Sequence, residues 1–321
     1  MRVPALLKPY GIAMGLTDII LIYFKRFLKV SSLLFIILTL LSSKAFAGVT
    51  FIDSFRVDHQ ETWPNGLAFN NDGTKMFVMG TDGDDVNEYT LSTGFDVSIA
   101  SFVDSFSVGS QESSAFGLAF SADGTKMFVT GSGGDDVNEY TLSTGFDVST
   151  ASFNDINGDG TGFDVSSQDG APVGLAFNTD GTKMFVVGQL GDDVNEYTLS
   201  TGFDVSTASF NDINGDGTGF DVSSQEASPT GLAFNNDGTK MFVLGATGQD
   251  VDEYTLSTGF DVSTASFVGS FSVSSQETNP WGLAFSADGT KMFVTGGNGD
   301  DVNEYSLSTG FEITGPTLSS S

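Results

Sequence analysis

Residues 66–80 read GLAFNNDGTKMFVMG, and this stretch occurs five times in the chain in nearly the same form. The GLAF tetrapeptide starts again at Gly117, Gly174, Gly231 and Gly282, so that the copies are 51, 57, 57 and 51 residues apart. Each copy continues through a segment close to GDDVNEYTLSTGFDVSTASF. Near-identical units of this length predict a repeat architecture, in which each unit packs against its neighbours.

Each unit contains four segments with the composition of β-strands, which we call a, b, c and d. In the first unit they are residues 66–69, 74–80, 85–92 and 102–108, and an Asp-Gly pair supplies the tight turn between a and b. Apolar residues occupy both faces of these strands, as expected for a sheet that is covered on both sides. Four antiparallel strands per repeat predict a β-propeller.

The repeat region begins with an additional strand d and ends with a copy that lacks one. Residues 51–57 match strand d of other copies (102–108 and 267–273), whereas the last copy ends after strand c, at residues 304–311. The sequence therefore predicts an all-β propeller of five four-stranded blades, closed by an N-terminal d strand that completes the last blade and leaves no open ring. A larger propeller or array, of which this chain is a part, is the alternative.

The repeat resembles a known family of propeller repeats. DGTKMFVxG followed by VNEYTLST is similar to the secreted bacterial repeats of the YVTN and WD40-like superfamily, over about residues 50–311. The resemblance implies the propeller fold. Such propellers include lactonases, surface-layer proteins, adhesins and binding modules, so it does not imply one function. This chain lacks the scattered His and Arg residues that a lactonase-like site is expected to need.

The composition narrows the classes of function. The chain has no Cys and a single His, His59, which excludes disulfides, Cys-based zinc sites and a Cys nucleophile and leaves little for a catalytic triad. The net charge of the chain is −29. Residues 1–47 hold six of the twelve basic residues and one of the 41 acidic residues. The remainder of the chain therefore has 6 basic and 40 acidic residues, a net charge of −34. Such a surface repels nucleic acid and anionic membranes.

The N-terminus reads as a targeting segment. Residues 24–30 are basic, residues 31–41 are apolar, and residues 42–47 end in a small-x-small pattern. This order is typical of a secretory signal, with cleavage after Ala47. Met14 is an alternative start, and a membrane anchor is the alternative interpretation of the apolar run.

These features predict three regions. Residues 1–47 are expected to be a signal peptide, residues 48–311 the propeller, and residues 312–321 a flexible tail or linker. We expect the protein to be secreted, either extracellular or periplasmic, and without stable membrane insertion after cleavage.

The copies differ mainly in two of their loops. In a four-stranded blade the d–a and b–c loops emerge on one face, and the a–b and c–d loops on the other. The c–d segment is nearly constant, whereas the d–a and b–c loops vary. The variable positions include Trp63 and the residue before each GLAF glycine, which is Asn65, Phe116, Val173, Thr230 or Trp281. Either exposed tips have drifted and the tryptophans pack the mouth of the channel, or this face binds a glycan or protein ligand.

The b–c tips also carry paired carboxylates. The second acid of the pair is Asp85, Asp136, Asp193 or Asp301, and we include these four residues in the candidate ligand-binding set. Turn chemistry, weak cation binding and acid–base catalysis are the interpretations of such pairs. Near-equal copies argue against catalysis, because two catalytic carboxyls need unlike environments. We assign no catalytic residue and expect a non-catalytic binding or surface module; a hydrolase of lactonase or glycosidase type and a structural module of a larger surface protein are the alternatives.

Two further residues recur once in each unit. A lysine begins strand b, and a glutamate precedes a tyrosine in the middle of strand c. A buried carboxylate needs a partner, so we expect the lysines to pair with acids in a structural role. The lysines are Lys75, Lys126, Lys183, Lys240 and Lys291, and the glutamates are Glu88, Glu139, Glu196, Glu253 and Glu304.

The sequence NDINGDGTGFD occurs twice, at residues 154–164 and 211–221, and accounts for the two longer units. Its first acids have the spacing of half a calcium loop, although Ser166 and Ser223 stand where a bidentate Glu is expected. Ca²⁺ is therefore the one candidate cofactor, and slippage of a repeated TGFDVS segment is the alternative. The candidate ligands are Asp155, Asn157, Asp159 and Asp164, and in the second copy Asp212, Asn214, Asp216 and Asp221.

Overall fold

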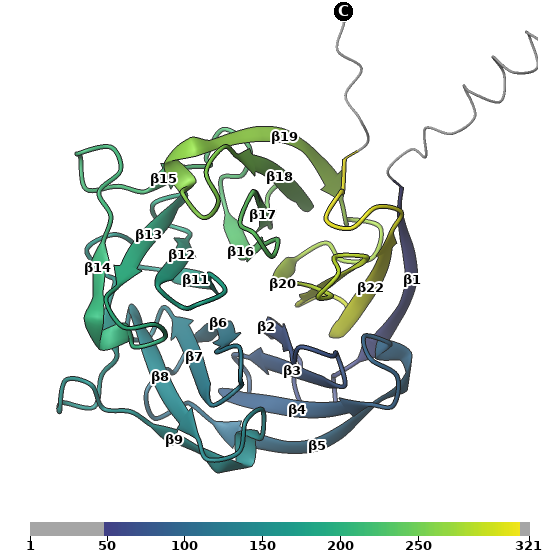
Figure 1. The fold of residues 1–321 in the computed structure, drawn as a ribbon. Coiled ribbons are helices and arrows are strands. Elements are labelled where there is room, and N and C mark those ends of the chain that lie inside the picture. Colours follow the sequence, from purple (N-terminus) through teal and green to yellow (C-terminus); the bar gives the residue numbers. More distant parts are fainter. Residues whose placement is uncertain (1–47, 315–321) are drawn as a thin grey trace, which may run out of the picture. The chain divides into compact units, whose positions relative to one another are not determined.

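A computed structural model describes residues 48–314. The predicted signal peptide, the alternative start at Met14 and residues 315–321 of the predicted tail lie outside the described residues. The described residues form five antiparallel sheets around a central axis (Figure 1). This arrangement confirms the predicted all-β, five-bladed propeller.

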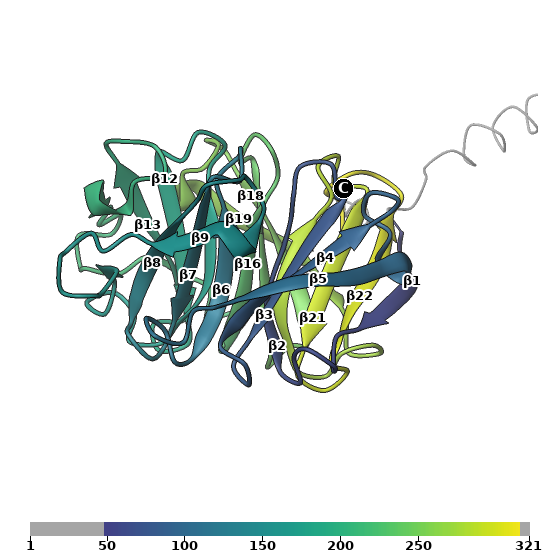
Figure 2. The same cartoon turned by 90° about the horizontal axis from the view of Figure 1, so that it is seen from below.

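Each blade runs from strand a at the axis to strand d at the rim (Figure 1). Blade one consists of β2 (Pro64–Phe69), β3 (Lys75–Gly80), β4 (Asp85–Leu91) and β5 (Ala100–Ser107). A one-turn 3₁₀ helix, η1 (Val97–Ile99), precedes β5. Seen from the side, the loops project from two opposite faces of the ring (Figure 2).

The other blades repeat this plan with the following elements. Blade two has β6 (Ala115–Phe120), β7 (Lys126–Gly131), β8 (Asp136–Leu142), η2 (Val148–Thr150), β9 (Ala151–Phe153) and β10 (Phe163–Asp164). Blade three has β11 (Pro172–Phe177), β12 (Lys183–Gly188), β13 (Asp193–Leu199), η3 (Val205–Thr207), β14 (Ala208–Phe210) and β15 (Phe220–Asp221). Blade four has β16 (Pro229–Phe234), β17 (Lys240–Gly245), β18 (Asp250–Leu256), η4 (Val262–Thr264) and β19 (Ala265–Ser272). Blade five has β20 (Pro280–Phe285), β21 (Lys291–Gly296), β22 (Asp301–Leu307) and, from the N-terminal end, β1 (Val49–Arg56).

The ring closes as the sequence predicts. β1 pairs antiparallel with β22, from Val49 opposite Leu307 to Arg56 opposite Asp301. The N-terminal strand therefore supplies the fourth strand of the last blade, and no blade of the described ring lacks its outer strand.

The two insertions lie at the rim. β9 and β10 both pair with β8, and β14 and β15 both pair with β13. Residues 154–162 and 211–219 thus split strand d of blades two and three. Their loops project outward from the edge of the ring (Figure 1).

The hydrophobic core lies between adjacent blades. The cluster between blades one and two combines Phe77 and Met79 with Met127 and Tyr140, all of them fully buried. An equivalent cluster joins Phe293 of blade five to blade one, so the core follows the ring without interruption. Large aromatic side chains are buried at every blade interface, and their burial favours closure of the ring.

A buried carboxylate ties each blade to the next, and we call this contact the latch. In the first latch, Glu88 accepts hydrogen bonds from Lys75 Nζ at 2.6 Å and from the backbone N–H of Val148 in blade two at 3.1 Å. Lys75 Nζ also donates to the carbonyl of Phe146 at 2.5 Å. A single ion pair therefore holds the c–d loop of the neighbouring blade at two backbone groups, two residues apart.

The latch is repeated around the whole ring. The five Lys–Glu pairs have N–O distances of 2.6–2.8 Å, which confirms the predicted pairing. Val97 N–H binds Glu304 and closes the ring between blades five and one. Ile313 N–H, near the C-terminal end of the described chain, binds Glu253 in the same way.

Candidate functional site

The d–a and b–c loops share one face of the ring, as expected, and we call it the variable face (residues 57–63 and 81–84 of blade one and their counterparts). In blade one, Glu61 joins the two loops. Its carboxylate accepts the backbone N–H of Trp63 at 2.8 Å, of Asp82 at 3.3 Å and of Gly83 at 3.4 Å. The loops of this face are therefore held by charge-assisted hydrogen bonds rather than by packing alone.

Every blade has such an acid, which sequence reasoning missed. The signal was available, since an Asp or Glu stands five residues before each GLAF glycine. Desolvation by burial raises the pKa of Glu61 and Glu112, although backbone N–H groups act in the opposite direction. The five buried acids are Glu61, Glu112, Asp169, Glu226 and Glu277.

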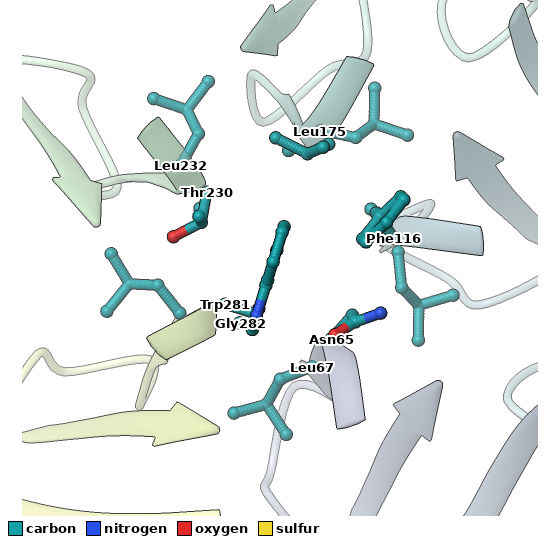
Figure 3. A pocket seen from close by; sticks show the side chains of 15 residues that line it. Asn65, Leu67, Phe116, Leu175, Thr230, Leu232, Trp281 and Gly282 are labelled. Carbon is teal, nitrogen blue, oxygen red and sulfur yellow. The ribbon is translucent and has the colours of Figure 1, made fainter. Parts of the chain in front are cut away.

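The five residues that precede the GLAF glycines meet at the axis. They lie on the innermost strands and line a cavity of about 20 Å³ (Figure 3). Trp281 and Phe116 stack across the axis with ring centroids 5.0 Å apart and planes inclined by 26°. Trp281 therefore packs the mouth of the channel, which was one of the two interpretations of the tryptophans.

The axial cavity contains buried polar groups that lack protein partners. Asn65 is 2% exposed, and neither its Nδ2 nor its Oδ1 is hydrogen-bonded within the described ring; Trp281 Nε1 is likewise without a partner there. Thr230 Oγ1, by contrast, donates to the carbonyl of Pro280 at 3.0 Å. A polar cavity of this size accommodates a single water molecule or hydroxyl group.

Trp63 differs from Trp281 in being at the surface. Its side chain is 39% exposed and lies against Gly297, in the b–c loop of blade five. A Cβ atom at Gly297 would be 2.8 Å from an indole carbon, so the glycine permits this contact. The residues next in sequence to Trp63 and Gly297 carry hydrogen-bonding side chains, with Thr62 bound to Asp82 and Asn298 to Thr278. Trp63 is thus an exposed aromatic residue in a part of the variable face that carries polar side chains.

The paired carboxylates do not join the axial residues. Asp85 begins β4, and its Oδ1 accepts a hydrogen bond from Asn87 Nδ2 at 2.8 Å. Asp85 also faces Ser107 on the rim strand β5, in the outer half of the blade. Asp136, Asp193 and Asp301 occupy the same place in their blades, where each accepts from the Asn two residues later.

Blade four departs from this pattern, which sequence reasoning also missed. Asp252 stands where the other blades have Asn, and it is 2% exposed. Its Oδ2 and the Oδ1 of Asp250 are both buried without a partner in the described part of the chain. Desolvation by burial, and then the charge of Asp250, raise the pKa of Asp252 to about 7.

The calcium candidates at the rim are engaged with their own loops. Asp155 Oδ1 accepts three backbone N–H groups, from Gly158 at 2.7 Å and from Asp159 and Gly160 at 3.1 Å. The second loop repeats these contacts through Asp212. Asp164 lies apart on β10, where it accepts the N–H of Ser166. Within residues 48–314, no group of three or more Asp, Glu or His side chains is arranged to hold a metal ion.

Calcium binding at these loops stays a prediction with a simple test. If calcium binds, the Tm measured with calcium should exceed the Tm measured with a chelator. This difference should vanish when Asp155, Asp159, Asp212 and Asp216 are replaced by Ala. Because Asp155 also organises its loop, the calcium-dependent increment must be compared within each variant. An unchanged Tm of the parent protein would contradict the calcium site and favour the slippage account.

Comparison with known proteins finds distant similarity to solved structures and nothing else. No family model and no curated protein matches the chain. A solved structure of a luciferin-regenerating enzyme is 12% identical, covers 84% of this chain and 98% of its own, and has a TM-score of 0.49. Putative 6-phosphogluconolactonases from Bacteroides uniformis ATCC 8492 and Bacteroides fragilis NCTC 9343 are 12% and 15% identical, each over 78% of this chain and over 69% and 68% of their own, with TM-scores of 0.46 and 0.47.

The structure bears on membrane association only in one respect. No helix within residues 48–314 has the length and apolar character needed to cross a bilayer.

Proposed function

We propose that this protein is a secreted, non-catalytic propeller that binds a glycan on its variable face, with Trp63 as the principal contact. The observation that carries the proposal is that Trp63 is 39% exposed and that its indole lies on Gly297 of the neighbouring blade. A flat aromatic surface beside hydrogen-bonding groups suits a sugar ring, whose C–H groups stack while its hydroxyls bind at the edges. The resemblance of the repeats to secreted YVTN-like propellers supports the proposal.

Rigidity of the loops supports the proposal. Glu61 fixes the backbone at Trp63 and at the b–c tip of the same blade, so the indole is presented by a preorganised loop. A preorganised surface loses little conformational entropy when a ligand binds. A protein ligand on the same face is the other outcome that the binding experiment distinguishes.

Replacing Trp63 by Ser tests the contact. Ser is the natural residue at this position in blades two and four (Ser114 and Ser228), so the variant is expected to fold. For a glycan identified on an array, we expect Kd to rise at least about tenfold, since truncation of an anchoring aromatic costs about 1.4 kcal/mol or more. Isothermal titration of parent and variant measures the change.

A matched control uses another exposed apolar residue of the same face. Leu190, in the b–c loop of blade three, is exposed, and Leu190→Gly supplies the residue of blade two. This variant should keep the affinity of the parent. Equal affinities of the parent and the Trp63→Ser variant would contradict the proposal, as would the absence of binding to any glycan on the array.

A hydrolase of lactonase or glycosidase type is the second candidate, and blade four supplies its one specific observation. Asp250 is partly exposed and Asp252 is buried, and acid–base hydrolysis uses two carboxyls in unlike environments. Asp252 is 2% exposed, however, so a substrate would not reach it in this conformation. Turnover of a lactone or an aryl glycoside that is lost in Asp252→Asn would favour the hydrolase over the binding module.

A further inference from the structure

Four of the five blades share one hydrogen bond between side chains on strand c. An Asn donates its Nδ2–H to the Oδ1 of the Asp two residues earlier, on the same side of the strand. The donor–acceptor distance is 2.8 Å for Asn87–Asp85, 2.5 Å for Asn138–Asp136, and 2.7 Å for both Asn195–Asp193 and Asn303–Asp301.

Blade four has a second carboxyl group in place of this donor. Asp252 occupies the Asn position, and its Oδ2 and the Oδ1 of Asp250 are both buried without a partner in the described chain. Two ionised carboxylates two residues apart on one side of a strand, and out of water, repel each other strongly. An O–H on one of them would restore the hydrogen bond that the other blades make through N–H.

We propose that Asp252 holds a proton at mildly acidic pH and donates it in a hydrogen bond to Asp250, so that blade four contains a proton-binding site that the other four blades lack. The surroundings support this assignment. The groups that act on Asp252 are Asp250 on the same strand, Glu226 in the d–a loop and Ser270 on β19, all of them acidic or neutral. Its carboxylate in turn helps to raise the pKa of the neighbouring Tyr254 hydroxyl.

The proton makes the stability of the ring depend on pH. The folded protein keeps the proton of Asp252 up to about pH 7, whereas the unfolded chain releases it near the ordinary value of 3.8. Between these limits the folded state binds one more proton than the unfolded state, so this contribution to stability is full below pH 4 and is lost as the pH rises to 7.

Asp252→Asn isolates this effect, because it gives blade four the residue of its neighbours. The ratio of the unfolding constants, parent over variant, should rise about tenfold per pH unit between pH 4 and pH 7 and then level off. Urea unfolding of both proteins across this range provides the ratio. In the parent, a carboxyl ¹³C resonance should titrate near pH 7, and it should be absent from the variant.

The reverse substitution serves as the control. Asn87→Asp creates the same pair beside Asp85 in blade one, where residue 87 faces Ser105 as Asp252 faces Ser270. The free energy of unfolding of this variant should fall more steeply with rising pH than that of the parent. A parent-to-variant ratio that is constant with pH would overturn the proposal. So would stabilisation of the parent at pH 8 by added CaCl₂ that Asp252→Asn lacks, because a cation would then occupy the position of the proton.

Discussion

Replacing Glu88 by Ala is expected to lower the free energy of unfolding by about 3 kcal/mol, because it removes one latch between blades. The substitution leaves the cation of Lys75 without its counter-charge and the N–H of Val148 without its acceptor. Lys75 is partly exposed and can recover some hydration, which keeps the effect at the lower end of the range for broken buried ion pairs. Urea unfolding measures the change.

A surface ion pair is the matched control for this prediction. Arg56 and Asp58 are separated by 2.7 Å, but the guanidinium side chain is 65% exposed. Asp58→Ala should therefore cost less than about 1 kcal/mol. Similar losses for the two variants would contradict the assignment of the latch as a principal contact between blades.

Replacing Gly124 by Ala is expected to be at least as damaging, at about 3–5 kcal/mol, because backbone strain and a steric clash add. Gly124 has φ +71°, a conformation that disfavours residues with a Cβ atom. A Cβ atom there would also be 2.2 Å from the ring of Phe146, the residue whose carbonyl accepts from Lys75. Displacement of Phe146 by the clash would also disturb its carbonyl, which is part of the first latch.

Gly158 separates the two causes. It has a similar φ of +75° in the rim loop of blade two, but a Cβ atom would meet nothing within 4 Å. Gly158→Ala should thus cost only the backbone term, about 1–2 kcal/mol. Equal losses in unfolding experiments on the two variants would show that the Phe146 contact contributes little.

The blade count and the closure of the ring could be predicted because they depend on pattern alone. Copies of GLAF and DGTKMFV fix the number of blades, and the match of residues 51–57 to other d strands identifies the closing strand. The Lys–Glu latch was predictable as a pairing, since both residues recur once in each unit. Its backbone partners on the next blade depend on how blades pack, which the repeat does not encode locally.

The candidate site could be predicted only in part. Asn65 and its counterparts share one position in the repeat, so five-fold geometry brings them to the axis. The sequence does not show that Trp281 lies at the axis whereas Trp63 lies at the surface. Trp281 stacks on Phe116 across a channel whose width follows from the number of blades, whereas Trp63 rests on a glycine of the adjacent blade. The sequence shows that Asp252 replaces the Asn of the other copies. The resulting rise in its pKa depends on burial, which the sequence does not show.

Indole N–H resonances provide the most direct test of ligand binding on the variable face. The chain contains only two tryptophans, so a ¹⁵N-labelled sample gives two indole signals that Trp63→Ser assigns. We predict that a glycan identified on an array shifts the Trp63 signal in proportion to saturation and leaves the Trp281 signal in place. A shift of Trp281 alone, or of neither signal at saturating glycan, would contradict binding at Trp63.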